Sequence, residues 1–298
     1  MISHTKVRTR SLVIGVAVLL AASSSLTSCQ KVTGGRYAQE VFKVNGVDQI
    51  EQVATAETYR TAIDFDTKQN IELKLDIWQP KNDPITDPRP VQMWMHGGAW
   101  TKGSGTRASI QGYAQDAASR GYIGVTISYR LRNAPAALPG SALDAYDDAV
   151  AAVQWLKDNA ARFRLDPNAI IVGGYSAGSI NAMNLVYPPY ERSQPSPPAS
   201  PVLGAIGIAG QNMGIAIPNR PPVIMFSATD DHTVPYSSVS TRCAEDRDVA
   251  STPPNICTLV TYPSGDHYIA YSRTDEIQGT AAQFAMDTLL PRAGYYLG

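Results

Sequence analysis

The sequence has few charged residues and no long run of either sign. Charged side chains make up 17% of the 298 residues and the formal net charge is −1, so the composition does not favour nucleic acid as a partner. The 23 glycines and 21 prolines suit a compact exported protein better than a disordered one. At 44% hydrophobic residues, the chain is long enough to bury one large core.

The apolar stretch near the N-terminus is too short to cross a membrane comfortably. "SLVIGVAVLLAA" has about a dozen residues and follows a short basic segment, as in a signal peptide. The next residues, "LTSC", resemble the bacterial lipobox, which implies cleavage before Cys29 and lipidation of that cysteine. An ordinary signal peptide with an incidental cysteine is the alternative. We therefore expect a signal segment over 1–29, a tether over 30–56, and a membrane-anchored lipoprotein of the cell envelope.

Cysteine is scarce, with three in the chain. If Cys29 carries the lipid, Cys243 and Cys257 remain. In an oxidising compartment we expect these two to form a disulfide, with two free buried thiols as the alternative. A metal site is not expected, because no second pair of ligands lies near the two cysteines.

From about residue 58 onward, strand-like and helix-like patterns alternate. An antiparallel hairpin around the polar turn "DTKQN" is followed by near-continuous apolar runs, which are typical of parallel strands buried on both faces. The runs cover 91–96, 122–128, 169–175, 202–208, 222–228 and 257–263. Helical spacing covers 107–120, 141–163, 177–187, 236–248 and 274–289. The alternation predicts a three-layer α/β sandwich over 57–298, with a mostly parallel central sheet and an N-terminal antiparallel hairpin.

Two connections in the second half of the chain are too short or too rich in proline for a large additional layer. The segment 187–201 contains six prolines, "YPPYERSQPSPPASP", and 211–222 is also short. The sequence therefore predicts a reduced cap and an open pocket walled by loops.

The stretch "GGYSAGS" (173–179) places one serine between glycines at a predicted strand-to-helix junction. A sharp turn there crowds the backbone of Ser176, and glycines at 174 and 178 avoid clashes of neighbouring Cβ atoms. The start of a helix also directs backbone N–H groups, including that of Ala177, toward the serine. We interpret Ser176 as a candidate nucleophile; a plain connection made of small residues is the alternative.

The stretch "HGGAW" (96–100) follows another buried strand and contains two consecutive glycines. In such a turn the peptide N–H groups can face a cavity with no side chain in the way. The N–H groups of Gly98 and Ala99, together with that of Ala177, are candidate donors to a developing oxyanion. A simple tight turn is the alternative.

An acid and a base are also predicted at strand ends. Asp230 and Asp231 follow the strand over 222–228, at the edge of an α/β sheet where active sites form, and the pattern alone does not separate them. Of the four histidines, His267 lies beyond the last strand, while His232 neighbours the acids and is the alternative base. A histidine can take the serine proton when a carboxylate fixes its tautomer.

The chain from about 58 to 290 resembles the α/β-hydrolase superfamily, in which the order is Ser, Asp, His. The segments "HGGAW", "ISYRL", "LDPNAIIVGGYSAG" and "LDIWQP" are similar to bacterial carboxylesterases and hormone-sensitive-lipase-like esterases, including the feruloyl-esterase-like group. The family pattern Asp-x-x-Val-Pro selects Asp231 in "DHTVP". The resemblance also implies oxyanion donors at Gly98, Ala99 and Ala177. The chain departs from the family by Ser179 in place of a third glycine, and by its proline-rich loop.

These observations predict a serine carboxylic-ester hydrolase with a Ser176–His267–Asp231 triad, no metal and no organic cofactor. Its partners would be a small-molecule or polymer-borne ester and the membrane that holds the lipid. Trp100, Tyr175 and Tyr268 lie beside the catalytic positions and are candidate substrate contacts, with plain packing as the alternative. A peptidase or amidase of the same fold would use the same triad. A catalytically silent binding protein is the remaining alternative.

Overall fold

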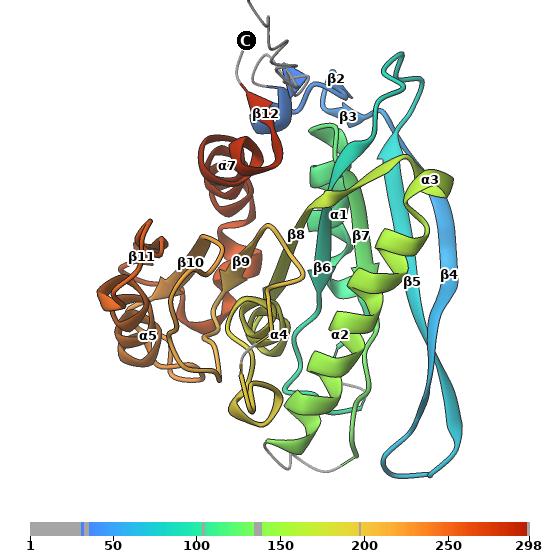
Figure 1. The fold of residues 1–298 in the computed structure, drawn as a ribbon. Coiled ribbons are helices and arrows are strands. Elements are labelled where there is room, and N and C mark those ends of the chain that lie inside the picture. The colour runs from blue at the N-terminus through green and yellow to red at the C-terminus, as the bar shows by residue number, and fades with distance from the viewer. Residues whose placement is uncertain (1–30, 33–35, 103–104, 134–138, 197, 297–298) are drawn as a thin grey trace, which may run out of the picture.

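The computed structural model describes residues 31–32, 36–102, 105–133, 139–196 and 198–296. Its centre is an eight-stranded sheet in the order β11-β10-β9-β8-β6-β7-β5-β4 (Figure 1). The strands are β4 (Ile50–Ile63), β5 (Asn70–Pro80), β6 (Arg89–Met95), β7 (Ile123–Ile127), β8 (Leu165–Tyr175), β9 (Gly204–Ile208), β10 (Val223–Ala228) and β11 (Cys257–Tyr262). Strands β6 to β11 are parallel, whereas β5 is antiparallel to β7 and to β4. The predicted mostly parallel sheet with its leading hairpin is confirmed.

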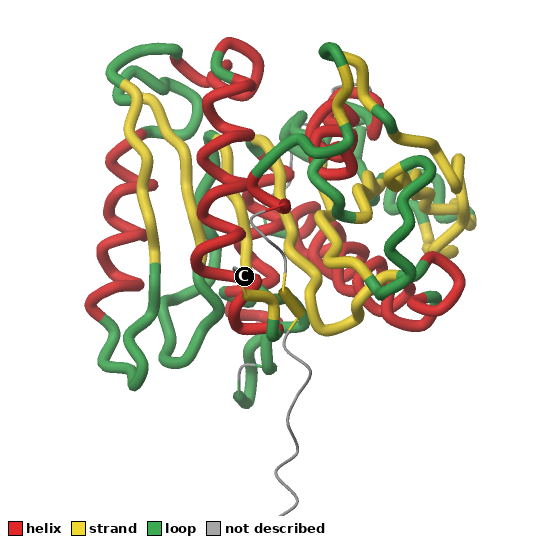
Figure 2. Tube along the Cα trace, turned by 90° about the horizontal axis from the view of Figure 1, so that it is seen from above, coloured by secondary structure: helices red, strands yellow, loops and turns green. Residues whose placement is uncertain are grey.

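Helices cover both faces of the sheet (Figures 1 and 2). One face packs against α2 (Gly140–Asp158), α3 (Ala160–Phe163), α4 (Ala177–Val186) and α5 (Tyr236–Asp248). The other packs against α1 (Gln111–Ser119), α6 (Ile269–Ser272), α7 (Thr274–Phe284) and a π-helical turn, η5 (Ala285–Leu289). The short 3-10 turns are η2 (Arg107–Ile110), η3 (Tyr190–Arg192), η4 (Asp266–Tyr268) and η6 (Leu290–Ala293). Two apolar cores therefore enclose the sheet in three layers.

The central strands are buried because most of their side chains are apolar on both faces. Every residue of β6, β7, β9 and β10 is buried, as expected for parallel strands covered by helices. Each fully buried Val, Ile or Met stabilises the fold by about 1.5–3 kcal/mol relative to exposure. The burial holds the carboxyl ends of the parallel strands at one edge of the sheet.

Residues 31–32 and 36–56 are part of the fold, so the prediction of a tether over 30–56 is wrong for these described residues. Strand β1 (Lys31–Val32) pairs with β12 (Tyr295–Tyr296), η1 (Arg36–Ala38) follows, and β2 (Lys43–Val44) pairs with β3 (Val47–Asp48). Tyr37 is 5% exposed and packs edge-on against the ring of Tyr122. Backbone hydrogen bonds add to this contact, since the N–H of Phe42 donates to the carbonyl of Ser119 at 2.8 Å and Arg120 donates to the carbonyl of Ala38 at 2.7 Å. Elements this short are held by contacts with distant residues and show no helical or strand periodicity in the sequence.

The predicted signal segment and Cys29 lie outside the described residues. Within the part of the chain that the structure describes, no helix combines the length and the apolar character needed to span a membrane. Among the residues 187–222, the described ones form only η3, β9 and loops, as the prolines predict.

Cys243 on α5 and Cys257 at the start of β11 are joined by a disulfide, with their Cα atoms 5.4 Å apart. The bond closes a loop of 14 residues. In the chain-entropy model, a loop of this length stabilises the folded state by about 3 kcal/mol. The link holds α5 against the edge strand β11.

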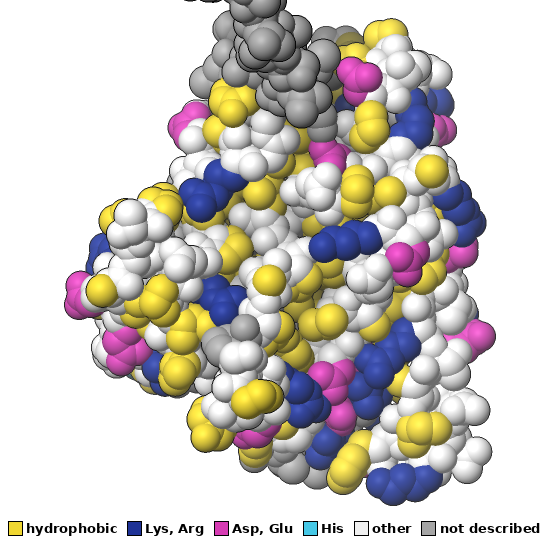
Figure 3. All heavy atoms as spheres, in the orientation of Figure 1, with side chains coloured by type: hydrophobic (Ala, Val, Ile, Leu, Met, Phe, Trp, Pro, Cys, Tyr) yellow, Lys and Arg dark blue, Asp and Glu magenta, His cyan; other side chains and the backbone are white. Residues whose placement is uncertain are grey.

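Charges of both signs alternate over the face shown in Figure 3, including the lower half of α2. Below the surface, the side chain of Asp148 on α2 is fully buried. It accepts hydrogen bonds from Arg60 of β4 and from Arg130, which follows β7. Burial raises the pKa of Asp148, and the Arg130 hydrogen bonds oppose that effect. These ion pairs fasten α2 to the hairpin and to the loop after β7.

The turn of the β4–β5 hairpin holds a second ion pair. Nζ of Lys102 lies 2.8 Å from Oδ2 of Asp64 and 2.9 Å from Oδ2 of Asp66. The hydrogen bond from Lys102 lowers the pKa of Asp64 from 3.8 to about 2, against the opposing effect of burial and with help from Thr67. The pair connects the hairpin to the segment that follows "HGGAW".

The Asp64 pKa predicts how stability depends on pH. Because the folded-state pKa lies below the usual 3.8, the stabilisation is complete above about pH 4 and is lost as the pH falls toward about 2. Asp64→Asn should lower the free energy of unfolding at pH 6 by about 1 kcal/mol, since Lys102 is partly exposed and screened. The deficit should shrink at pH 3. Urea unfolding at both pH values measures this.

Lys102→Met serves as the partner variant in a double-mutant cycle. If the Asp64–Lys102 pair accounts for the effect, the loss in the double variant should be smaller than the sum of the two single losses, and the remaining loss from Lys102→Met reflects its pair with Asp66. Fully additive losses, or a deficit that is independent of pH, would contradict the assignment.

Candidate active site

Ser176 lies between the end of β8 and the first residue of α4. Its backbone adopts φ 54° and ψ −121°, a region that side-chain-bearing residues rarely occupy. Its N–H donates to the carbonyl of Ile208 on β9, at 2.9 Å. The strained turn raises the half-buried serine above the carboxyl edge of the sheet.

The glycines on either side of Ser176 are required by close backbone contacts. A Cβ at Gly174 would lie 2.2 Å from the carbonyl carbon of Gly178, and a Cβ at Gly178 would lie 2.1 Å from the carbonyl oxygen of Met95. Both contacts are with main chain that cannot easily move. The helix α4 therefore begins directly against the ends of β6 and β8.

His267 and Asp231 complete a chain of hydrogen bonds with the serine. Nε2 of His267 lies 2.8 Å from Oγ of Ser176, and Nδ1 lies 3.0 Å from Oδ2 of Asp231. Because a carboxylate only accepts hydrogen bonds, Nδ1 carries the proton and Nε2 presents its lone pair to the hydroxyl. The side chain of Asp231 is fully buried and that of His267 is 10% exposed.

The two neighbouring aspartates have different partners. Oδ1 of Asp231 accepts the N–H groups of Thr233 and Val234 at 2.8 and 2.9 Å, which orients the carboxylate toward His267. Asp230 instead accepts the N–H of Asp266 at 2.8 Å. The structure thus separates two residues that the sequence pattern left equivalent.

Asp266 was missed by the sequence reasoning. Its Oδ1 accepts the N–H of His232 at 3.2 Å, while its own N–H donates to Asp230. The loops that carry the acid and the histidine are therefore bonded to each other in both directions. His232 itself is exposed, and the hydroxyl of Ser176 faces His267. The position of Asp266 directly before His267 was the available signal.

The glycine turn after β6 faces the serine from the other side. Gly98 (φ 109°), Ala99 (φ 48°) and Trp100 (φ 56°) are three consecutive residues with positive φ. Gly98 and Ala99 border the same cavity as Ser176. Ala177 is the first residue of α4, where a backbone N–H has no partner within the helix. All three predicted oxyanion donors thus belong to segments that adjoin the serine.

The side chain of His96 stabilises this turn through contacts in the core. Its ring is buried and stacks on Tyr129 with ring centroids 4.3 Å apart. Nδ1 lies 2.7 Å from the carbonyl oxygen of Gly97, so it must be the protonated nitrogen. Burial lowers the pKa of His96, which keeps the ring neutral. His96 therefore braces the turn and does not face Ser176.

A cavity of about 570 Å³ opens above the serine. Tyr175 is 7% exposed, whereas Tyr268 and Tyr271 are 63% and 54% exposed. The Tyr175 ring packs against the rings of His267 and Tyr271, with centroids 5.3 and 5.2 Å apart. Burial raises the pKa of Tyr175, so its hydroxyl stays protonated. The lining residues are Gly98, Ala99, Thr101, Tyr175, Ser176, Thr233, His267, Tyr268 and Tyr271.

The structure does not place Trp100 in this cavity. Its indole is 4% exposed and packs in the core beneath α4, where Nε1 donates to Oδ1 of Asn181 at 2.9 Å. The predicted substrate contact at Trp100 is therefore wrong. The positive φ of this residue turns its large side chain into the core, where an indole N–H needs a partner. Tyr175 and Tyr268 do line the cavity, and Tyr271 joins them.

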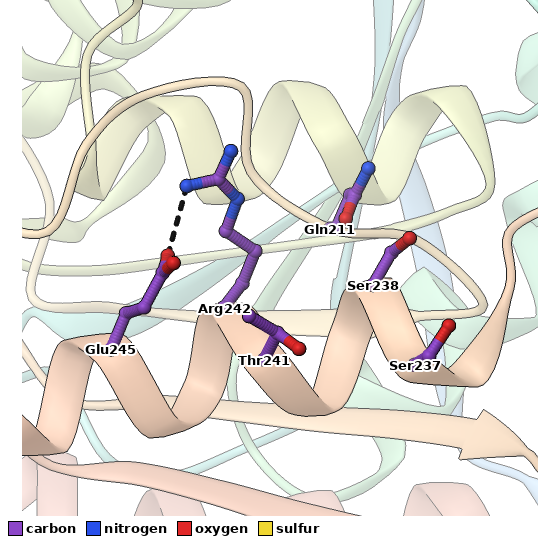
Figure 4. Close-up of a pocket in the computed structure, with 6 residues that line it drawn as sticks. All are labelled: Gln211, Ser237, Ser238, Thr241, Arg242 and Glu245. Atoms are coloured by element: carbon purple, nitrogen blue, oxygen red, sulfur yellow. Dashed lines mark hydrogen bonds and ion pairs between the residues drawn. The ribbon is translucent and has the colours of Figure 1, made fainter.

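A second hollow of about 340 Å³ lies between α5 and Gln211 (Figure 4). Ser237, Ser238 and Thr241 line it with hydroxyl groups, and the charge of Arg242 is paired with Glu245 at 2.9 Å. Its lining contains none of Ser176, His267 and Asp231, so it is separate from the candidate site. Among the described residues, no three His, Cys, Asp or Glu side chains are grouped to hold a metal ion.

Comparison with known proteins agrees with this architecture. Residues 75–185 match the family model described as BD-FAE. Against known structures, the chain is similar to esterase 2 of Thermogutta terrifontis, solved after phosphoramylation by tabun, with a TM-score of 0.63 and 22% identity over 80% of this chain and 94% of that one. The protein has the α/β-hydrolase fold. The same esterase has also been solved with propionate bound, at a TM-score of 0.62 and 23% identity over 78% of this chain and 93% of that one.

Curated relatives are similar to the central part of this chain. Phenmedipham hydrolase of Pseudarthrobacter oxydans is 35% identical over 125 residues, 40% of this chain and 24% of that protein. Esterase LipC of Mycobacterium tuberculosis is 34% identical over 144 residues, 46% of this chain and 33% of that protein. Gut esterase 1 of Caenorhabditis briggsae is 34% identical over 139 residues, 44% of this chain and 24% of that protein. The matches thus span a quarter to a third of the relatives.

The glycine at the start of α4 gives a testable prediction. Gly178→Ala places a Cβ 2.1 Å from the Met95 carbonyl oxygen, and we expect it to lower the free energy of unfolding by roughly 1–3 kcal/mol. Gly279→Ala in α7 is the matched control, because nothing lies within 4 Å of its added Cβ. The control should gain about 1 kcal/mol from the higher helix propensity of alanine. Thermal unfolding of both variants measures this, and equal effects would contradict the packing argument.

Proposed function

We propose that this α/β-hydrolase is a serine carboxylic-ester hydrolase. The observation that carries the proposal is the chain of hydrogen bonds from Ser176 Oγ through His267 to Asp231, at 2.8 and 3.0 Å, at the floor of an open cavity. In the proposal Ser176 is the nucleophile, His267 the general base and Asp231 the residue that fixes the imidazole tautomer. The esterase names of the relatives support the same reading.

The geometry suits a two-step acyl transfer. Nε2 of His267 takes the proton of Ser176 as Oγ attacks the ester carbonyl, and the backbone N–H groups of Gly98, Ala99 and Ala177 stabilise the oxyanion. Collapse of the tetrahedral intermediate breaks the bond to the alcohol, which leaves with the proton from His267. Water then attacks the acyl-serine with the same histidine as base, and releases the acid.

The open cavity supports a substrate that enters directly from solvent, because the described residues form no cap that has to open first. Tyr268 and Tyr271 are more than half exposed at its rim, so they offer flat apolar surfaces to the group that enters. The Tyr175 ring forms the inner wall beside the histidine. We propose that the ester belongs to external, small-molecule or polymer-borne material.

We also propose that the protein is exported and anchored through a lipid on Cys29. The support is the lipobox-like "LTSC" after an apolar signal segment. The Cys243–Cys257 disulfide adds support, since disulfides persist mainly outside the cytoplasm.

The proposed nucleophile predicts the effect of a single substitution. Ser176→Ala should lower kcat for p-nitrophenyl acetate by about a million-fold, as removal of the serine does in comparable triads, with an unchanged circular dichroism spectrum. Ser179→Ala is the matched control, because this serine lies on the same helix and its Oγ has no hydrogen-bond partner among the described residues. The control should keep near-full activity.

Two outcomes would contradict parts of the proposal. Persistent hydrolysis by Ser176→Ala would exclude Ser176 as the nucleophile. Faster turnover of p-nitroacetanilide than of p-nitrophenyl acetate by the wild type would favour an amidase.

The proposed anchor has its own test. Full-length protein expressed in bacteria that are fed an alkyne fatty acid should incorporate the label, and Cys29→Ala should not. The double variant Cys243→Ala/Cys257→Ala is the matched control and should remain labelled. Equal labelling of Cys29→Ala and wild type would exclude this cysteine as the lipid site.

A further inference from the structure

The turn that borders the candidate oxyanion site is held in an unfavourable conformation. Gly98, Ala99 and Trp100 have φ values of 109°, 48° and 56°. For alanine and tryptophan this region costs of order 1–3 kcal/mol per residue, and it persists only when surrounding contacts enforce it. Within the turn, the N–H of Thr101 donates to the carbonyl of Gly98 at 2.9 Å. Contacts outside the turn must therefore hold it.

The Trp100 side chain supplies such a contact. Its indole is 4% exposed, and Nε1 donates to Oδ1 of Asn181 at 2.9 Å. Asn181 is fully buried on α4. Within this core, breaking the bond would leave a buried donor or acceptor unpaired, at a cost of about 1–3 kcal/mol. The backbone of Trp100 is fixed as well, because its carbonyl accepts the N–H of Arg132 at 2.9 Å.

The helix that accepts this hydrogen bond is the one that begins directly after Ser176. Gly98 and Ala99 lie on the turn, and Ala177 lies at the first position of α4. The Trp100–Asn181 bond is thus a side-chain link between the two backbone segments whose N–H groups would converge on the oxyanion. We propose that Trp100 and Asn181 are positioning residues that set the spacing of the oxyanion donors. This inference rests on the proposed esterase function.

The proposal predicts a particular kinetic signature. Oxyanion donors act on charge that develops in the transition state, so a change in their spacing lowers kcat more than it alters KM. Removing one direct donor costs about 100- to 1,000-fold in kcat. Removing a link that only positions the donors should cost less, about 10- to 50-fold. The acid limb of the pH–rate profile should not move, because the His267–Asp231 pair is untouched.

Two single variants and their combination test the link. Trp100→Phe keeps an aromatic ring in the core but removes the indole N–H, and Asn181→Leu removes the acceptor. Each should lower kcat for p-nitrophenyl acetate by about 10- to 50-fold with KM within about two-fold. The double variant should be little worse than either single variant, because both remove the same bond. Labelling by a fluorophosphonate, which forms a tetrahedral adduct, should slow in parallel.

Trp78→Phe is the matched control. Trp78 lies on β5, is 3% exposed and packs in the core on the opposite face of the sheet. It should lose stability comparable to that lost by Trp100→Phe while keeping kcat within about two-fold of the wild type. The comparison separates a general loss of packing from an effect on the oxyanion turn.

Other results would contradict the link, the positioning role or the proposed function. Wild-type kcat in Trp100→Phe, or additive losses in the double variant, would overturn the link between Trp100 and Asn181. A raised KM with unchanged kcat would show that Trp100 contacts the substrate, and would overturn the positioning role. A wild-type protein that is neither labelled by the fluorophosphonate nor active on esters would overturn the proposed function, and this inference with it.

Discussion

The close approach of α4 to the ends of β6 and β8 is the constraint on which the site depends. A Cβ at Gly178 would lie 2.1 Å from the carbonyl oxygen of Met95, so the helix can start there only if this position has no side chain. The approach forces Ser176 into its strained φ of 54° and lifts its hydroxyl above the sheet. It also places the first turn of the helix beside the glycine turn after β6. The candidate nucleophile and the candidate oxyanion donors are thus positioned by one packing contact.

Loops, rather than strands, carry the other site residues, and short polar links keep these loops in place. Asp230 and Asp266 join the loop of the acid to the loop of the histidine. Lys102 ties the segment after the glycine turn to the hairpin through Asp64. These bonds lie at the surface or close to it, where a single ion pair is worth little. Their contribution is to restrict loop geometry, which is what a proton relay between distant segments requires.

The absence of a cap among the described residues leaves the rim tyrosines as the main walls of the cavity. The described residues between α4 and β10 form only η3, β9 and loops. The described part of 187–222 therefore leaves the aromatic surfaces of Tyr268 and Tyr271 accessible. A site of this shape restricts substrates through the inner wall at Tyr175 more than through enclosure.

The sequence by itself determined the sheet, the order of its strands along the chain and the serine turn, because apolar runs, helical spacing and flanking glycines are local signals. It also indicated His267 by elimination. Tertiary structure decided what depends on contacts between distant segments. It folded residues 31–32 and 36–56 onto the domain, and it buried Trp100 against Asn181. These outcomes depend on contacts between segments that lie far apart in the sequence. The pattern of neighbouring residues does not encode which distant partner a strand or a buried polar group will find.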